Sequence, residues 1–80
     1  MPTTVEEVKE IIAQEFPGAN ADDIKEQPDH RLSGKIIWAE FKEMDSVERH
    51  RLVSDRVRKR LGLRGLNVGI LYPLAPGEKL

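Results

Sequence analysis

The strongest constraint on the fold is a β-strand pattern that leads within a few residues into a long amphipathic helix. Residues 35–41 are rich in β-branched and aromatic side chains, which predicts a strand. Asp45 or Ser46 then supplies a helix N-cap, and apolar residues at helical spacing predict a helix over residues 46–61 that stops at Gly62. A strand and a helix are therefore joined by a short connection.

Three further elements follow from the same local signals. Thr4 opens a capping box, and the apolar spacing after it predicts a helix over residues 5–16. Residues 22–27 are polar and predict a short, solvated edge strand. Residues 66–72 predict another strand, which is expected to end at Pro73.

The order helix, strand, strand, helix, strand predicts an α+β fold in two layers, with the helices on one face of a three-stranded, mostly antiparallel sheet. Eighty residues without cysteine predict one small domain over residues 1–80 that has neither disulfides nor a cysteine nucleophile. The sequence holds no apolar run long enough to span a membrane, and its start is acidic where a signal peptide is basic. We therefore expect a soluble cytoplasmic protein.

The charges are distributed unevenly along the chain. Residues 1–45 carry a net charge of −6 and residues 46–80 carry +5, which together give the overall −1. This asymmetry indicates either a basic patch that faces an anionic partner or two halves that attract each other within the molecule. The sequence leaves both interpretations open.

The basic residues concentrate on the predicted helix over residues 46–61. Phosphates of a nucleic acid or an acidic protein face are candidate partners for it, and the side chains proposed to bind them are Arg49, Arg51, Arg56 and Arg60. The alternative is a solvated helix face, and no aromatic residues are interleaved for base stacking. The Gly62–Gly65 segment matches the G-x-x-G string of nucleic-acid-binding loops, but we interpret it as a helix C-cap and turn.

The two histidines, His30 and His50, are the candidate metal ligands. On a helical wheel His50 falls between Val57 and Leu61, in the middle of the apolar stripe, so it is either a packed core-edge residue or a ligand at the rim of the core. His30 lies in a polar loop, where a solvated histidine is the alternative. No pair of acid/base or nucleophilic side chains stands out, so we do not expect an enzyme.

The segment from Phe41 to Val53 resembles the signature of BolA-like proteins, in which a Phe-Glu-Gly turn leads into a helix that contains Val-x-Arg-His-Arg-Leu-Val. His50 is in register with the histidine of that signature, while Glu43 stands in place of the turn glycine. The segment Leu74–Glu78 is similar to the Leu-Thr-Pro-Glu-Glu ending of the family.

The resemblance implies an α-β-β-α-α-β domain related to the KH fold and a non-enzymatic role. It also implies a partnership with a monothiol glutaredoxin through a shared 2Fe–2S cluster, with His50 as one ligand and His30 as the candidate second ligand. The remaining ligands would be thiolates of glutaredoxin and glutathione. Two alternatives stay open: a nucleic-acid-binding transcriptional regulator that uses the basic helix 46–61, and a metal-free KH-like protein-interaction domain.

Overall fold

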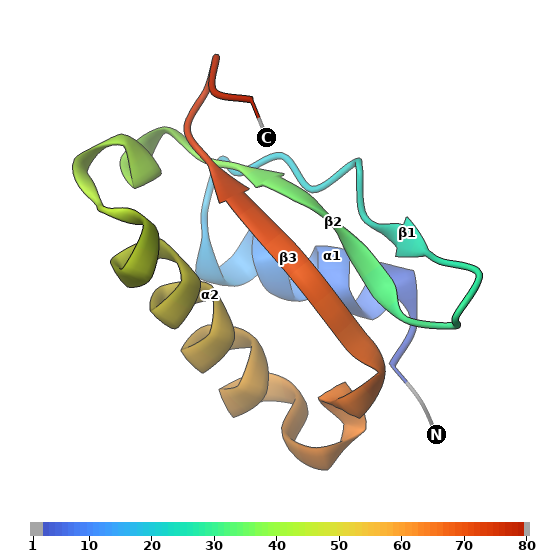
Figure 1. Cartoon of the computed structure of the whole chain (residues 1–80). Coiled ribbons are helices and arrows are strands. Elements are labelled where there is room, and N and C mark those ends of the chain that lie inside the picture. Colours follow the sequence, from blue (N-terminus) through green and yellow to red (C-terminus); the bar gives the residue numbers. More distant parts are fainter. Residues whose placement is uncertain (1–2, 80) are drawn as a thin grey trace.

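A computed structural model describes residues 3–79 of the chain. Its elements, in chain order, are α1 (Val5–Glu15), β1 (Lys25–Glu26), β2 (Leu32–Ile37), the 3-10 helix η1 (Ala39–Glu43), α2 (Ser46–Leu61), the 3-10 helix η2 (Gly62–Asn67) and β3 (Val68–Leu74). Within this range the strands form one three-stranded sheet in the order β1-β2-β3. Both α-helices pack on one side of that sheet (Figure 1), which confirms the predicted α+β class.

Local capping fixes the helix ends close to where the sequence predicted them. The Thr4 hydroxyl accepts a hydrogen bond from the Glu7 N–H, and the Glu7 carboxylate accepts one from the Thr4 N–H. Asp45 is the N-cap of α2, where its carboxylate accepts the Glu48 N–H at 2.8 Å. Gly62, at a φ of 56°, ends α2 in a conformation that favours glycine.

The pairing of the sheet differs from the predicted mostly antiparallel arrangement. β1 pairs with β2 antiparallel over only two residue pairs, whereas the longer pairing of β2 with β3 is parallel. The reason is the connection: α2 carries the chain back along the sheet, so β3 starts at the same end as β2. The sheet is therefore mixed, with parallel pairing along most of its length.

Both of the longer predicted strands have different ends in the structure. β2 starts at Leu32 and ends at Ile37, and Phe41 lies in η1 instead of at the end of a strand. The prediction over residues 35–41 is confirmed for residues 35–37 and was wrong for residues 38–41, where the chain leaves the sheet and Phe41 turns into the core. β3 continues through Pro73 because it is an edge strand, where a missing N–H breaks no pairing.

One apolar core joins the helices to the inner face of the sheet. Phe16, the C-cap of α1, and Phe41 of η1 are almost fully buried, and both rings contact Trp38, with centroids 5.0 Å and 5.2 Å from the indole. The other buried residues of these elements include Val8, Ile11 and Ile12 of α1, Leu32 and Ile36 of β2, Val53, Val57 and Leu61 of α2, and Leu71 of β3.

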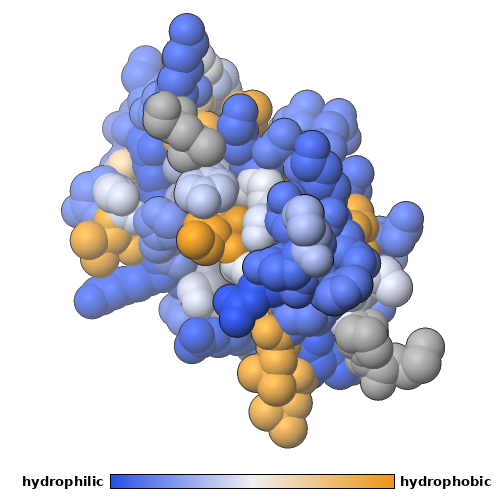
Figure 2. Space-filling model, turned by 45° about the vertical axis from the view of Figure 1, so that its right-hand side comes forward, coloured by the Kyte–Doolittle hydropathy of each residue, from blue (hydrophilic) through white to orange (hydrophobic). Residues whose placement is uncertain are grey.

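The face shown in Figure 2 is largely hydrophilic, but an apolar group projects at its lower end. Figure 1 places the turn from α2 into η2 at the same end of the molecule. None of the described helices is long and apolar enough to cross a membrane.

Candidate functional site

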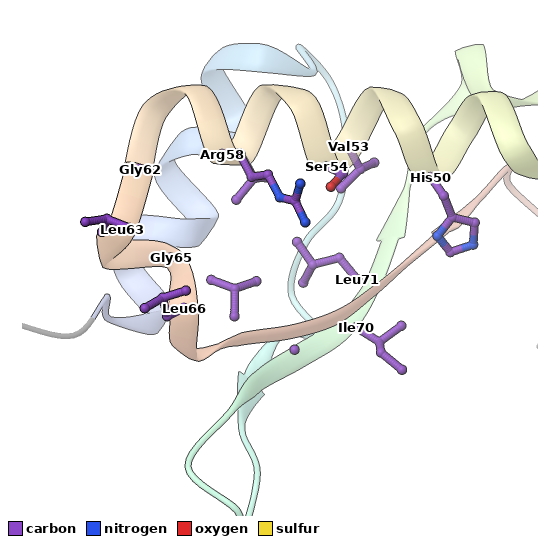
Figure 3. Close-up of a pocket in the computed structure, with 13 residues that line it drawn as sticks. His50, Val53, Ser54, Arg58, Gly62, Leu63, Gly65, Leu66, Ile70 and Leu71 are labelled. Atoms are coloured by element: carbon purple, nitrogen blue, oxygen red, sulfur yellow. The ribbon is translucent and has the colours of Figure 1, made fainter.

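A groove of about 750 Å³ lies between α2, η2 and β3 (Figure 3). Val53 and Val57 of α2 and Leu71 of β3 are buried and form its floor. His50 lines the end of the groove near the start of α2, and the Gly62–Gly65 segment lines the other end. This volume is within the range of pockets that hold small ligands or short segments of a partner chain.

His50 is exposed in the second turn of α2 and lines this groove. Its position on the helical wheel had suggested burial, but the buried stripe of α2 begins at Val53, one turn later. Among residues 3–79, neither ring nitrogen of His50 takes part in a hydrogen bond. An exposed imidazole of this kind can bind a metal or a partner through either nitrogen.

His30 lies in the turn between β1 and β2, and its imidazole is almost entirely exposed. Its backbone has a φ of 67°, and its Nδ1 atom lies 3.2 Å from a carboxylate oxygen of Glu26. A positive φ is uncommon outside glycine and marks the tight turn that lets β2 return beside β1. The loop position predicted for His30 is therefore confirmed.

The structure does not bring His30 and His50 together. His30 follows β1, at one edge of the sheet, whereas His50 lines a groove beside β3, at the other edge. Among the described residues there is also no cluster of three or more histidine, aspartate or glutamate side chains that could hold a metal ion. The resemblance made His30 the candidate second ligand beside His50, and the strand order places the two histidines at opposite edges of the sheet.

Three of the four arginines proposed to bind partners, Arg49, Arg56 and Arg60, make ion pairs within the molecule. Arg56 and Arg60 contact the two carboxylate oxygens of Glu15 at 3.2 Å and 3.0 Å, and their hydrogen bonds lower the pKa of Glu15. Arg64 likewise pairs with Glu7. These contacts join the basic second half of the chain to the acidic α1, which favours the intramolecular interpretation of the charge asymmetry.

Arg49 ties α2 to the last described residues of the chain. Its guanidinium donates to the Met44 carbonyl at 3.0 Å and pairs with the Glu78 carboxylate at 2.5 Å. Glu78 also accepts the Ala75 N–H, so both bonds stabilise its ionised form and lower its pKa from 4.5 to about 2, with Arg49 as the larger cause. Arg51, by contrast, is exposed and makes no ion pair among residues 3–79.

This ion pair predicts a pH dependence of stability. Because the folded pKa of Glu78 is lowered, its contribution is present above pH 4.5 and is lost as the pH falls towards 2. At neutral pH the thermal midpoint of the wild type should therefore be higher than that of Glu78→Gln. The difference between the two midpoints should close as the pH is lowered towards 2. A gap that stays constant down to pH 2 would contradict the assignment.

Comparison with known proteins identifies the fold. No protein-family model matches the sequence, and no curated protein is significantly similar to it. Among solved structures, a BolA protein homologue from Coxiella burnetii has a TM-score of 0.64 at 15% identity and covers 91% of this chain and 88% of its own. BolA1 from Arabidopsis thaliana has a TM-score of 0.63 at 20% identity, with both chains fully covered. The chain has a BolA-like fold.

In this BolA-like fold, the second member of the expected helix pair is the short 3-10 helix η2. Gly62 caps α2 as predicted, but the segment then continues as η2 up to Asn67 instead of forming an open turn. The groove itself was not predicted. Its only sequence signal was the presence of large apolar residues, Leu63, Leu66 and Ile70, in segments interpreted as a connector and a strand.

Proposed function

We propose that this chain is a non-enzymatic BolA-like adaptor that partners a monothiol glutaredoxin and shares a 2Fe–2S cluster with it. The observation that carries the proposal is the exposed His50 on α2, in a BolA-like fold and in register with the histidine of the family signature. Its ring nitrogens have no hydrogen-bond partner among residues 3–79, so ligation would break no internal contact.

The donor set of the described residues fits a shared cluster and not one held by this chain alone. His50 offers one imidazole, and between residues 3 and 79 no group of three or more histidine, aspartate or glutamate side chains could hold a metal ion. The proposal therefore excludes His30 and takes the other ligands from thiolates of the partner and glutathione. A cluster bound in this way supplies iron and sulfide that can be passed on to other proteins.

The role of this chain is to present and release one ligand. Histidine binds metal only as neutral imidazole, so acid opposes ligation by His50. Imidazole in place of a thiolate also raises the reduction potential of a 2Fe–2S centre. Both effects favour a cluster that is labile and transferable over one that is permanently held.

Reconstitution with a purified monothiol glutaredoxin, iron, sulfide and glutathione tests the proposal. Visible absorption and circular dichroism should show a mixed complex with the wild type, and His50→Ala should abolish the spectrum of that complex. His30→Ala is the matched control, since it removes an exposed imidazole at the other edge of the sheet, and we expect its spectrum to equal that of the wild type. An unchanged spectrum for His50→Ala would refute the ligand assignment.

A further inference from the structure

Large exposed apolar side chains gather around the groove. Among residues 3–79 these side chains are Val47, Leu63, Leu66 and Ile70, and all but Val47 line the groove. Leu63 and Leu66 are 85% and 80% exposed, and η2, which carries both, lies at the end of the molecule where Figure 2 shows the projecting apolar group. An exposed apolar cluster with a polar rim is typical of a surface that binds another chain.

The groove also exposes the free edge of β3. The Leu74 carbonyl accepts the Trp38 N–H, and the Ile70 N–H donates to the Ser33 hydroxyl, so these alternate residues of β3 direct their polar groups towards β2. Because successive residues of a strand point their N–H and C=O groups to opposite edges, those of Leu71 and Pro73 point away from β2, towards α2. Arg49 confirms this direction, since its guanidinium lies 3.5 Å from the Pro73 carbonyl.

Only a short part of this edge is open to a new partner strand. Pro73 has no N–H, and its carbonyl is covered by Arg49. A proline and a charged side chain are two common ways of protecting a strand edge from pairing. Near its start, β3 is bulged between Val68 and Leu71, where Gly69 lies so close to the Ser33 hydroxyl that a Cβ would be 2.4 Å from it. The N–H and C=O of Leu71, in the middle of the groove, point away from β2 and make no backbone hydrogen bond outside the sheet among residues 3–79.

The rim of the groove carries unpaired positive charge. Arg58 is exposed, lines the groove and makes no ion pair among residues 3–79, in contrast to Arg56 and Arg60 on the other side of α2. An acidic residue of a bound segment would therefore meet a cation that does not have to leave another partner.

The same features argue against a nucleic acid in the groove. Its floor is aliphatic, and among the described residues that line it only His50, at one end, has an aromatic ring, so the floor offers bases no stacking platform. The Gly62–Gly65 segment is part of the 3-10 helix η2 and is not an open loop. Arg64 of this segment pairs with Glu7 on α1, which leaves its charge compensated.

We infer that this groove binds a short extended segment of a partner protein, with alternating apolar and acidic residues, as an additional strand on β3. Alternation suits this site because successive side chains of a strand point to opposite faces, so that apolar residues on the α2 side reach the floor while acidic residues stay in solvent, within the positive field of Arg58. Two backbone hydrogen bonds to Leu71 would set the register. The inference requires neither iron nor glutaredoxin and goes beyond the proposed function.

The probe is a fluorescent peptide of about eight residues in which valine alternates with glutamate, a length typical of a strand. It is titrated into the metal-free protein, with affinity measured by fluorescence anisotropy and amide hydrogen exchange followed by NMR. We expect exchange of the Leu71 amide to slow when the peptide binds. Exchange of the Tyr72 amide, which already faces β2, should stay unchanged.

Two matched variants on α2 distinguish a contact in the groove from a general effect of net charge on peptide binding. Arg58→Glu should weaken peptide binding about tenfold, which corresponds to about 1.4 kcal/mol. Lys59→Glu makes the same charge change at an exposed position that does not line the groove, and it should leave the affinity within about twofold. Circular dichroism of both variants confirms that they are folded.

Specific results would overturn the inference. A peptide that is N-methylated along its backbone keeps its side chains but cannot donate hydrogen bonds, so equal binding of this analogue would exclude strand addition. Tighter binding of a single-stranded oligonucleotide of similar length, weakened by Arg58→Glu, would assign the groove to nucleic acid instead. Self-association of the protein that the peptide does not displace would assign it to a second copy of this chain.

Discussion

Replacing Phe41 by alanine should remove most of the stability of this protein. The Phe41 side chain is fully buried, and its ring packs against Phe16 and Trp38 with centroids 6.0 Å and 5.2 Å away. Loss of the buried ring and the cavity that it leaves cost about 3–5 kcal/mol. For a domain of this size, 1 kcal/mol shifts the thermal midpoint by roughly 4–8 °C, so we expect a decrease of at least about 12 °C in thermal melts followed by circular dichroism.

Leu63→Ala is the control for this measurement, because Leu63 is also a large apolar residue but is 85% exposed. Its melting temperature should stay within about 2 °C of the wild type, as surface substitutions seldom change stability by more than about 0.5 kcal/mol. If the two variants lost equal stability, Phe41 could not be the centre of the aromatic cluster that anchors η1 to the core.

Gly34→Ala should also destabilise the fold strongly, through a clash instead of a cavity. A Cβ atom at Gly34 would lie 2.6 Å from the Asp23 carbonyl oxygen and 2.6 Å from the Ile24 Cα atom. Both are backbone atoms of the segment that leads into β1, so no side chain can rotate away and the chain itself must move. Overpacking of this kind costs typically about 1–3 kcal/mol, and we expect the upper part of that range in urea denaturation.

The movement of the segment around Asp23 in Gly34→Ala should also be detectable by local hydrogen exchange. The Lys35 N–H donates to the Asp23 carboxylate at 3.0 Å, so its hydrogen exchange should accelerate in Gly34→Ala before global unfolding. Gly18→Ala is the comparison: Gly18 has a φ of 88° but no heavy atom near its Cβ position, so this variant should lose only about 1 kcal/mol from backbone strain. Equal losses in the two variants would argue against the close approach of the two segments.

The parts of the structure that the sequence predicted depend on contacts between near neighbours in the chain. The capping box at Thr4 and the N-cap at Asp45 act over three residues, and the apolar stripe of α2 repeats every three or four. These signals placed both α-helices to within one residue. The resemblance to BolA-like proteins, carried by Phe41–Val53, added a fold that the comparison with solved structures confirmed.

The strand ends and the sheet pairing required the tertiary structure. Residues 35–41 look like a uniform strand in sequence, and only the packing of Phe41 against Phe16 shows that the chain leaves the sheet after Ile37. Pro73 was expected to end β3, but its position at the free edge allows the strand to continue. Both outcomes depend on partners that lie far away in the sequence.

In the candidate site, too, the sequence predicted some features and the tertiary structure decided others. The sequence selected His50 and placed His30 in a loop, but the strand order β1-β2-β3 decided that the two lie at opposite edges of the sheet. The basic helix was also evident from the sequence, whereas its pairing with Glu15 of α1 and with Glu78 arises from the packing of α2. Capping and periodicity act within a few residues and can be recognised in the local sequence. The separation of the two histidines, the ion pairs of α2 and the groove depend instead on which distant segments the fold brings into contact.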